Sequence, residues 1–80
     1  MILGLYSIKD ELNGFTPLIP FNGEAMAKRY LRDQYESNPT IKNTPDDFSI
    51  WYICSFDTET GKISQTGEPK LIERAGNYGK

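Results

Sequence analysis

The chain has 80 residues, with nine Lys and Arg against eleven Asp and Glu, a net charge of −2 and no histidine. This length suits one domain with one hydrophobic core, so we expect a single domain over residues 1–80. The charge is not that of a protein that coats nucleic acid by bulk attraction. Cys54 is the only cysteine, which excludes an internal disulfide and, without histidine, a four-ligand zinc site.

The small size also bears on assembly and location. A domain this short buries only roughly 60–65 % of the surface of its unfolded chain, so association would add needed buried area and we predict a homodimer. No stretch approaches the ~20 apolar residues of a membrane span. The first residues lack the basic leader and apolar run of a signal peptide, and a lone cysteine is typical of a reducing compartment. We therefore expect a cytoplasmic protein without a membrane partner.

The first half of the chain predicts a strand, a loop and a helix. Residues 2–9 are apolar on both alternating faces, as in a strand covered on two sides. Residues 10–14 end in an Asn-Gly turn signal. Residues 15–21 carry Pro17 and Pro20, which exclude a central strand, so we expect an extended loop. Its apolar side chains are expected to pack onto the core: Phe15, Leu18, Ile19 and Phe21.

Residues 23–37 are the one long predicted helix. Asn22 is the expected N-cap, and Glu24 lies in the first turn, where it complements the helix dipole. Pro39 ends the helix. One face is apolar at helical spacing, and it consists of Met26, Ala27, Tyr30, Leu31 and Tyr35.

The second half predicts mostly strands. A polar loop over residues 40–47 precedes the strongest strand, residues 48–56. Alternation places Phe48, Ile50, Tyr52, Cys54 and Phe56 on one face and Ser49, Trp51, Ile53 and Ser55 on the other. Residues 57–61 form a hairpin loop with Gly61 in the left-handed conformation. Residues 62–65 return as a short strand, residues 70–74 are a candidate edge strand, and residues 75–80 are an expected flexible tail. This order predicts an α+β fold, a small antiparallel sheet of three to four strands with one helix packed across it.

Two features are candidates for binding. The first is a cluster of cations on the exposed side of the helix, Lys28, Arg29 and Arg32, placed to contact backbone phosphates. The alternative is a solvated helix face with Arg29–Asp33 and Arg32–Glu36 pairs at i,i+4.

The second feature is Trp51, which lies opposite the main apolar face of its strand. On an open sheet, Trp51 would stack on unpaired bases. The alternative is that this face forms a second core or a dimer interface.

The remaining polar and reactive residues point away from catalysis. Asp46 and Asp47 precede a strand, where two carboxylates bind a metal only with further ligands and otherwise cap a turn. Cys54 lies on an apolar face and is expected to be buried and inert. No acid–base pair, phosphate loop or cofactor motif is present, so we expect no enzymatic activity, no metal and no cofactor.

Several segments resemble one protein family when taken together. They are Leu-Tyr-Ser-Ile-Lys-Asp at 5–10, Asn-Gly-Glu-Ala at 22–25, Asn38-Pro39, Lys-Asn-Thr-Pro-Asp-Asp-Phe-Ser at 42–49 and Phe-Asp-Thr-Glu-Thr-Gly-Lys-Ile at 56–63. Across most of residues 3–72 the chain resembles a small nonstructural protein of gokushoviruses, which are single-stranded DNA phages of the Microviridae. Members often have His where this chain has Thr44, and the family offers no catalytic residues to carry over.

The resemblance implies a phage accessory protein, in the host cytoplasm, that binds single-stranded DNA or the replication complex during genome synthesis. Lys28, Arg29 and Arg32 would contact phosphate, with Trp51 as a stacking platform. The alternative is a protein-interaction adaptor that recruits a host or phage partner, such as a replication or packaging protein, through the Trp51 face.

Overall fold

The computed structural model describes residues 1–65 and 67–79, and it confirms the α+β class with one main helix across an antiparallel sheet. The sheet of the described residues has six strands, more than the three to four expected, because several are only two or three residues long. The strands are β1 (Ile2–Asp10), β2 (Gly14–Phe15), β3 (Ile19–Phe21), β4 (Phe48–Asp57), β5 (Ile63–Ser64) and β6 (Lys70–Arg74).

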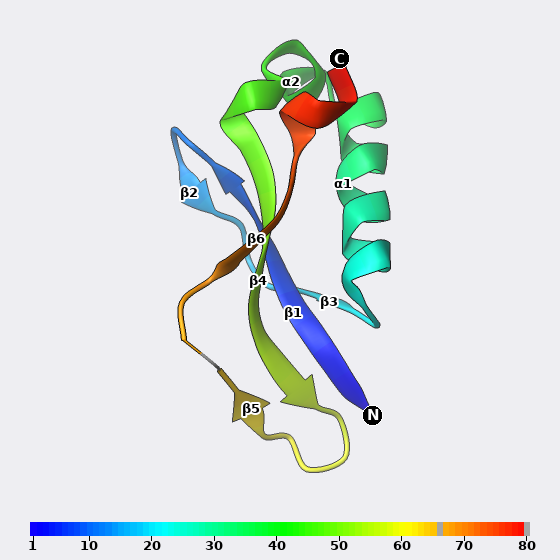
Figure 1. Ribbon diagram of the computed structural model, residues 1–80, viewed down its shortest axis with the longest axis vertical. Coiled ribbons are helices and arrows are strands. Elements are labelled where there is room, and N and C mark those ends of the chain that lie inside the picture. Colours follow the sequence, from blue (N-terminus) through cyan, green and yellow to red (C-terminus); the bar gives the residue numbers. More distant parts are fainter. Residues whose placement is uncertain (66, 80) are drawn as a thin grey trace.

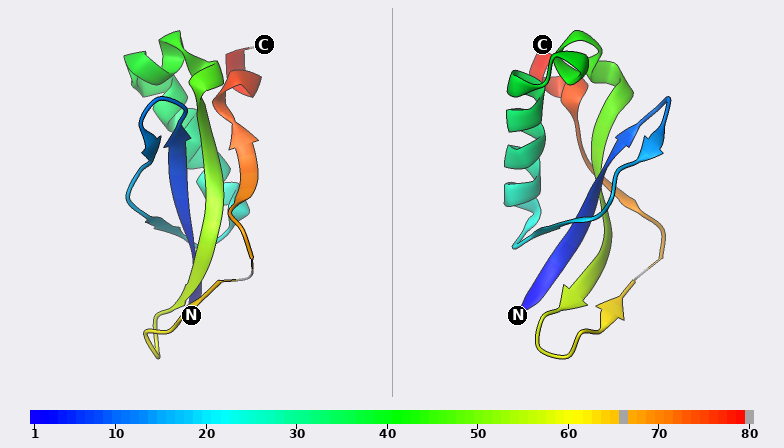
Figure 2. Two further views of the ribbon diagram at one scale, coloured as in Figure 1. Left: turned by 90° about the vertical axis from the view of Figure 1, so that its left-hand side faces the viewer. Right: turned by 180° about the vertical axis from the view of Figure 1, so that it is seen from behind.

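Strands β1 and β4 form the centre of the sheet and pair along their whole length, from Ile2 opposite Asp57 to Asp10 opposite Phe48. Strands β2 and β3 pair with one edge of β1, and β5 and β6 pair with the far edge of β4. Helix α1 (Glu24–Ser37) lies along one face, and the end of the sheet that carries β5 and the N-terminus extends beyond it (Figure 1). From the side, the sheet stands in front of the helix with its other face toward the viewer (Figure 2, left).

Residues 15–21, expected as a loop, instead contribute the two short strands at the β1 edge. Pro20 lies within β3, which is compatible with an edge strand because proline lacks the N–H that a further strand would need. Phe21 and Ile19 are half-buried, and Phe21 packs against the core as expected. Phe15 and Leu18 remain 49 % and 48 % exposed, so their expected burial was wrong.

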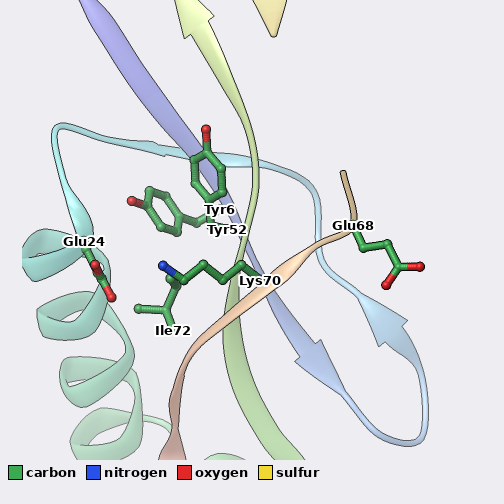
Figure 3. Close-up of a pocket in the computed structure, with 6 residues that line it drawn as sticks. All are labelled: Tyr6, Glu24, Tyr52, Glu68, Lys70 and Ile72. Carbon is green, nitrogen blue, oxygen red and sulfur yellow. The ribbon is translucent and has the colours of Figure 1, made fainter. Parts of the chain in front are cut away.

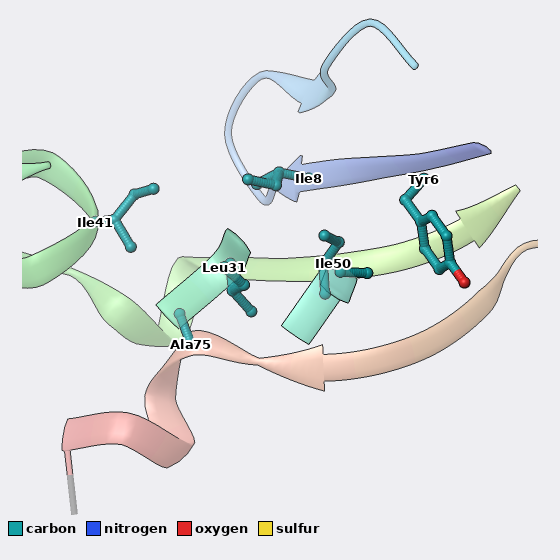
Figure 4. Close-up of a cluster of buried hydrophobic side chains, with 7 residues drawn as sticks. Tyr6, Ile8, Leu31, Ile41, Ile50 and Ala75 are labelled. Carbon is teal, nitrogen blue, oxygen red and sulfur yellow. The ribbon is translucent and has the colours of Figure 1, made fainter. Parts of the chain in front are cut away.

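Helix α1 buries a narrower stripe than its sequence suggested. Ala27 and Leu31 have no exposed surface and belong to one core cluster with Ile50 of β4, in which Leu31 lies near Ile50 (Figure 4). Met26 is 46 % exposed, which corrects its assignment to the buried face. The N-cap is Gly23, without a side-chain hydrogen bond, rather than Asn22. Glu24 lies in the first turn as expected.

The polar segment after α1 is helical rather than a loop. Asn38 caps a short helix α2 (Pro39–Asn43), its side-chain oxygen accepting the Thr40 N–H at 3.0 Å. Ile41 of this helix is buried in the core. A 3₁₀ turn, η1 (Pro45–Asp47), then leads into β4.

The C-terminal residues, expected as a flexible tail, form a second 3₁₀ turn, η2 (Ala75–Gly79); Lys80 lies outside the described residues. Ala75 has no exposed surface. Tyr78 packs its ring 5.8 Å from that of Tyr35, and its hydroxyl donates to the Lys28 carbonyl at 3.2 Å. These contacts fasten the chain end to α1.

A β-bulge at Ile53 changes which side chains of β4 share a face. Leu5 pairs with Cys54 but Tyr6 pairs with Tyr52, so Ile53 has no partner on β1. Directly paired residues share a face, so Cys54 and Phe56 lie on the face opposite Ile50. The expected unbroken alternation from Phe48 to Phe56 was therefore wrong at its second half, although Cys54 is buried as expected.

The hairpin loop after β4 matches its expected form. Gly61 has φ +76°, and its N–H donates to the Asp57 carbonyl at 2.7 Å. The Asp57 carboxylate accepts the Glu59 N–H at 2.9 Å. This bond and others from Thr60 lower the pKa of the exposed Asp57 carboxyl below its usual value.

Leu31→Ala tests the helix–sheet core. Because Leu31 is fully buried, its truncation should lower the free energy of unfolding by about 2–4 kcal/mol through lost contacts and a cavity. Met26→Ala is the matched control on the same helix, with an expected loss below about 0.5 kcal/mol. Chemical denaturation measures both, and equal losses would show that α1 docks through another face.

Acid titration of Asp57 tests the hairpin loop. Its pKa in the folded chain should lie below the value of about 3.9 for an unstructured aspartate. Because the pKa is lower in the folded chain than in the unfolded chain, the ionised carboxylate stabilises the fold at pH values above the unfolded pKa. This stabilisation is lost as the pH falls through the folded pKa. Carboxyl chemical shifts measured against pH would report the value, and a pKa at or above the unstructured value would contradict the loop geometry.

Candidate nucleic-acid interface

The three helix cations lie exposed on α1, on the side of the sheet that the helix covers. Arg32 is 3.8 Å from the Glu36 carboxylate, as the alternative of a paired helix face expected. The expected Arg29–Asp33 pair is not among the ion pairs of the described residues. Lys28 and Arg29 are exposed.

Trp51 lies on the opposite face of the sheet. It pairs with Ser7 of β1, whereas Ile50 next to it is buried beneath α1. Side chains alternate along a strand, so the sheet separates Trp51 from the helix cations. The structure therefore does not bring the four predicted residues into one site.

Trp51 instead belongs to a cluster with two residues that the sequence analysis did not select. The Phe15 ring from β2 meets the Trp51 ring edge-to-face, with centroids 6.2 Å apart. The Lys9 ammonium lies over both rings, 5.6 Å from the Trp51 centroid and 5.8 Å from that of Phe15. Lys9 also lies 3.8 Å from the Glu11 carboxylate. We call Lys9, Phe15 and Trp51 the aromatic cluster.

Hydrogen bonds hold the aromatic cluster in place. The Trp51 indole N–H donates to the buried Ser49 hydroxyl at 2.8 Å, which fixes the ring along β4. The Ser7 hydroxyl, 1 % exposed, donates to the Thr16 carbonyl at 2.7 Å, and the Thr16 hydroxyl accepts the Ile8 N–H at 3.0 Å. These bonds fold the chain after β2 against β1 and so position Phe15.

The strand register extends this site across the sheet. Phe15 pairs with Lys9, Lys9 with Ser49, and Ser49 with Arg74 of β6. These four residues form one row on the same face, and Trp51 lies between Ser7 and Leu71 in the next row. A bulge at Ile72 in β6 gives Arg74 this place, because it shifts the β4–β6 register by one residue.

We define the open face by the paired residues that the register places opposite α1: Leu3, Leu5, Ser7, Lys9, Phe15, Pro20, Ser49, Trp51, Cys54, Phe56, Ile63, Leu71 and Arg74. Its charged members, Lys9 and Arg74, are both cations, although the whole chain has a net charge of −2. The end near β5 is apolar, and Ile63 there is 64 % exposed. The open face thus has a cationic aromatic end and an apolar end.

Sequence reasoning found Trp51 but missed Lys9, Phe15 and Arg74. Lys9 and Arg74 each lie at the end of an apolar strand, where they look like ordinary solvated ends. Their common row exists only through cross-strand register and the bulge at Ile72, which leave no local signal. Phe15 was expected in the core.

Asp46 and Asp47 take structural positions. Both lie in η1, where the Asp47 carbonyl accepts the Glu11 N–H at 2.9 Å and Asp46 packs closely against Gly76. Across residues 1–65 and 67–79, no group of three Cys, Asp or Glu side chains is arranged to hold a metal ion. Within the same residues no helix is long and apolar enough to cross a membrane.

Comparison with protein families identifies the family of this chain. The family described as Phage ORF5 protein matches residues 3–78, nearly the whole chain. No curated protein and no solved structure matches the chain. The protein therefore belongs to the Phage ORF5 protein family.

Proposed function

We propose that this protein is a non-enzymatic accessory protein of a gokushovirus-like phage that binds single-stranded DNA during viral genome synthesis. The observation that carries the proposal is the Lys9 ammonium lying over both the Phe15 and Trp51 rings on the open face. Proteins that bind single strands combine exposed aromatic rings with cations that follow the backbone. Membership of a phage family and the resemblance to gokushovirus proteins support the same role.

The energies of the aromatic cluster favour an exchange of Lys9 for a base. A cation over an exposed ring contributes about 0.5–1 kcal/mol, whereas a stacked base contributes about 1–3 kcal/mol. A base on Trp51 therefore displaces the Lys9 ammonium at a net gain. The freed ammonium then pairs with a phosphate, and Arg74 at the other end of the row takes the next one along the strand.

The charge distribution makes this binding weak and gives it only a shallow dependence on salt. Two cations on the open face release few counterions, with an expected slope of log affinity against log salt near 0.7 for each phosphate contact. The net charge of −2 opposes a tight coat over long DNA. A protein with this surface suits a brief contact with an exposed strand.

A second candidate function is a protein-interaction adaptor, and the apolar end of the open face favours it. Leu3, Phe56 and Ile63 form a row there. The part of the sheet that carries β5 extends beyond α1 (Figure 1). Such a row suits contact with a phage or host protein, or with a second copy of the chain.

Light scattering tests the predicted homodimer. At micromolar concentration the measured mass should be about twice 9.1 kDa, and a monomer well above that concentration would argue against the dimer.

Titration of labelled single-stranded DNA at several salt concentrations tests the proposed function. Trp51→Ala should weaken affinity about 5- to 150-fold with the salt slope unchanged, because stacking of about 1–3 kcal/mol releases no counterions. Lys9→Ala should reduce the slope by about 0.7 for all sequences alike. Arg29→Ala is the matched control on α1 and should change neither quantity.

Other outcomes would redirect the proposal. Loss of affinity in a Lys28→Ala, Arg29→Ala, Arg32→Ala triple variant, with Trp51→Ala unaffected, would move the DNA contact to the helix face. No binding by the parent protein even at low salt, where charges are least screened, would reject DNA binding and leave the adaptor function.

A further inference from the structure

A pocket separate from the open face lies between the start of α1 and the sheet. Its volume is about 350 Å³, and its walls come from Tyr6, Glu24, Tyr52, Glu68, Lys70 and Ile72. Figure 3 shows five of these side chains on α1, β1, β4 and β6, with Glu68, which precedes β6, directed away from them. The volume lies within the range of about 300–1,000 Å³ for small-molecule sites.

Tyr6 is held rigidly with a free hydroxyl in this pocket. It is 5 % exposed, and its ring meets Phe21 and Tyr52 edge-to-face at 5.8 and 5.5 Å. Gly4 makes room for the ring, because a Cβ there would come within 2.6 Å of a Tyr6 ring carbon. Among the described residues the Tyr6 hydroxyl has no hydrogen-bond partner, whereas the Tyr52 hydroxyl bonds to Ser55. No buried side-chain polar atom of the described residues lacks a partner, so the Tyr6 hydroxyl is accessible to solvent at the pocket and free to bond to water or to a ligand.

The hydroxyl remains protonated under ordinary conditions and is available to donate. Burial raises the pKa of Tyr6, and the nearby Glu24 carboxylate and Tyr52 raise it further. The pocket therefore offers a neutral hydroxyl beside two charged side chains. It holds a donor and an acceptor that a polar ligand would use.

Three charged side chains line the pocket; Glu24 and Lys70 complement each other without pairing, and Glu68 is directed away from them (Figure 3). The Lys70 ammonium is directed toward Glu24 in Figure 3, yet the two form no ion pair within the part of the chain that the structure describes. A carboxylate only accepts hydrogen bonds and an ammonium only donates them. A ligand that bridges the pocket must therefore present a donor to Glu24 and an acceptor or anion to Lys70.

The apolar walls of the pocket further restrict the class of ligand that fits. The Tyr52 ring and the Ile72 side chain supply apolar surface against which a flat ring packs. A nucleotide combines a flat ring, a phosphate and, except in thymine, an exocyclic amino group that a carboxylate accepts. We propose that this pocket binds one nucleotide whose base carries an amino group, with Glu24 on the amino group, Lys70 on the phosphate and Tyr6 on a further polar atom of the ligand.

Calorimetric titration with free deoxynucleotide monophosphates tests the pocket. Those of cytosine and adenine should bind at least fivefold more tightly than that of thymine, whose ring offers an oxygen where the carboxylate needs a donor. Tyr6→Phe keeps the ring and removes the hydroxyl, and it should weaken binding several-fold. Tyr35→Phe, far from the pocket, is the matched control and should bind as the parent does. Glu24→Gln should abolish the preference over thymine, because an amide both donates and accepts.

A hexamer of deoxycytidine separates a free nucleotide from a nucleotide within a strand. If Tyr6→Phe weakens binding of the monophosphate but not of the hexamer, the pocket takes free nucleotides. If Tyr6→Phe also weakens binding of the hexamer, whatever the effect of Trp51→Ala, the pocket takes a nucleotide within a strand. The proposal would be overturned if no monophosphate binds and Tyr6→Phe leaves the affinity for the hexamer unchanged. It would also be overturned if all bases bind equally and Glu24→Gln does not change their affinities. The two proposals can fail separately. If Trp51→Ala weakens binding of single-stranded DNA and Tyr6→Phe does not, the proposed function is supported and the pocket proposal is rejected.

Discussion

Leu31 on α1 and Ile50 at the centre of β4 are both fully buried, and their contact determines which face of the sheet the one long helix covers. Residues 1–65 and 67–79 contain no second long helix to cover the other face. The open face therefore follows from which side of the sheet the core occupies. A sheet covered on one side commonly presents polar residues on the other, but here that face carries aromatic, apolar and cationic side chains.

The bulge at Ile53 divides the functions of β4 between the two faces. Before it, Ile50 and Tyr52 face α1 and build the core and the pocket. Beyond it, Cys54 and Phe56 continue the open face that Trp51 begins. Without the extra residue, Phe56 would lie on the face of Ile50, and the apolar end of the open face would lose its central ring.

The elements that local sequence determines were predictable. The long helix, the central strand and the Gly61 turn follow from periodicity, proline placement and a residue that tolerates positive φ. Register was not predictable in the same way, since a bulge depends on pairing between distant strands. For this reason the sequence identified Trp51 yet grouped it with Lys28, Arg29 and Arg32, which the sheet separates from it. Its neighbours Lys9 and Arg74 come from opposite ends of the chain.

The 3₁₀ turn at Ala75–Gly79 was missed because distant contacts stabilise it rather than its own small, polar sequence. These contacts are the packing of the Tyr78 ring on Tyr35 and the hydrogen bond from the Tyr78 hydroxyl to the Lys28 carbonyl.

The proposed contact with single-stranded DNA lies on the open face rather than on the helix. Two-dimensional ¹H–¹⁵N NMR of the labelled protein during addition of a short single strand tests this most directly, because the indole N–H of Trp51 is the only one in the chain. We expect shifts of that indole signal and of the Lys9, Phe15 and Arg74 amides, with Lys28, Arg29 and Arg32 unchanged. Shifts confined to α1, with the indole signal unmoved at saturating DNA, would contradict it.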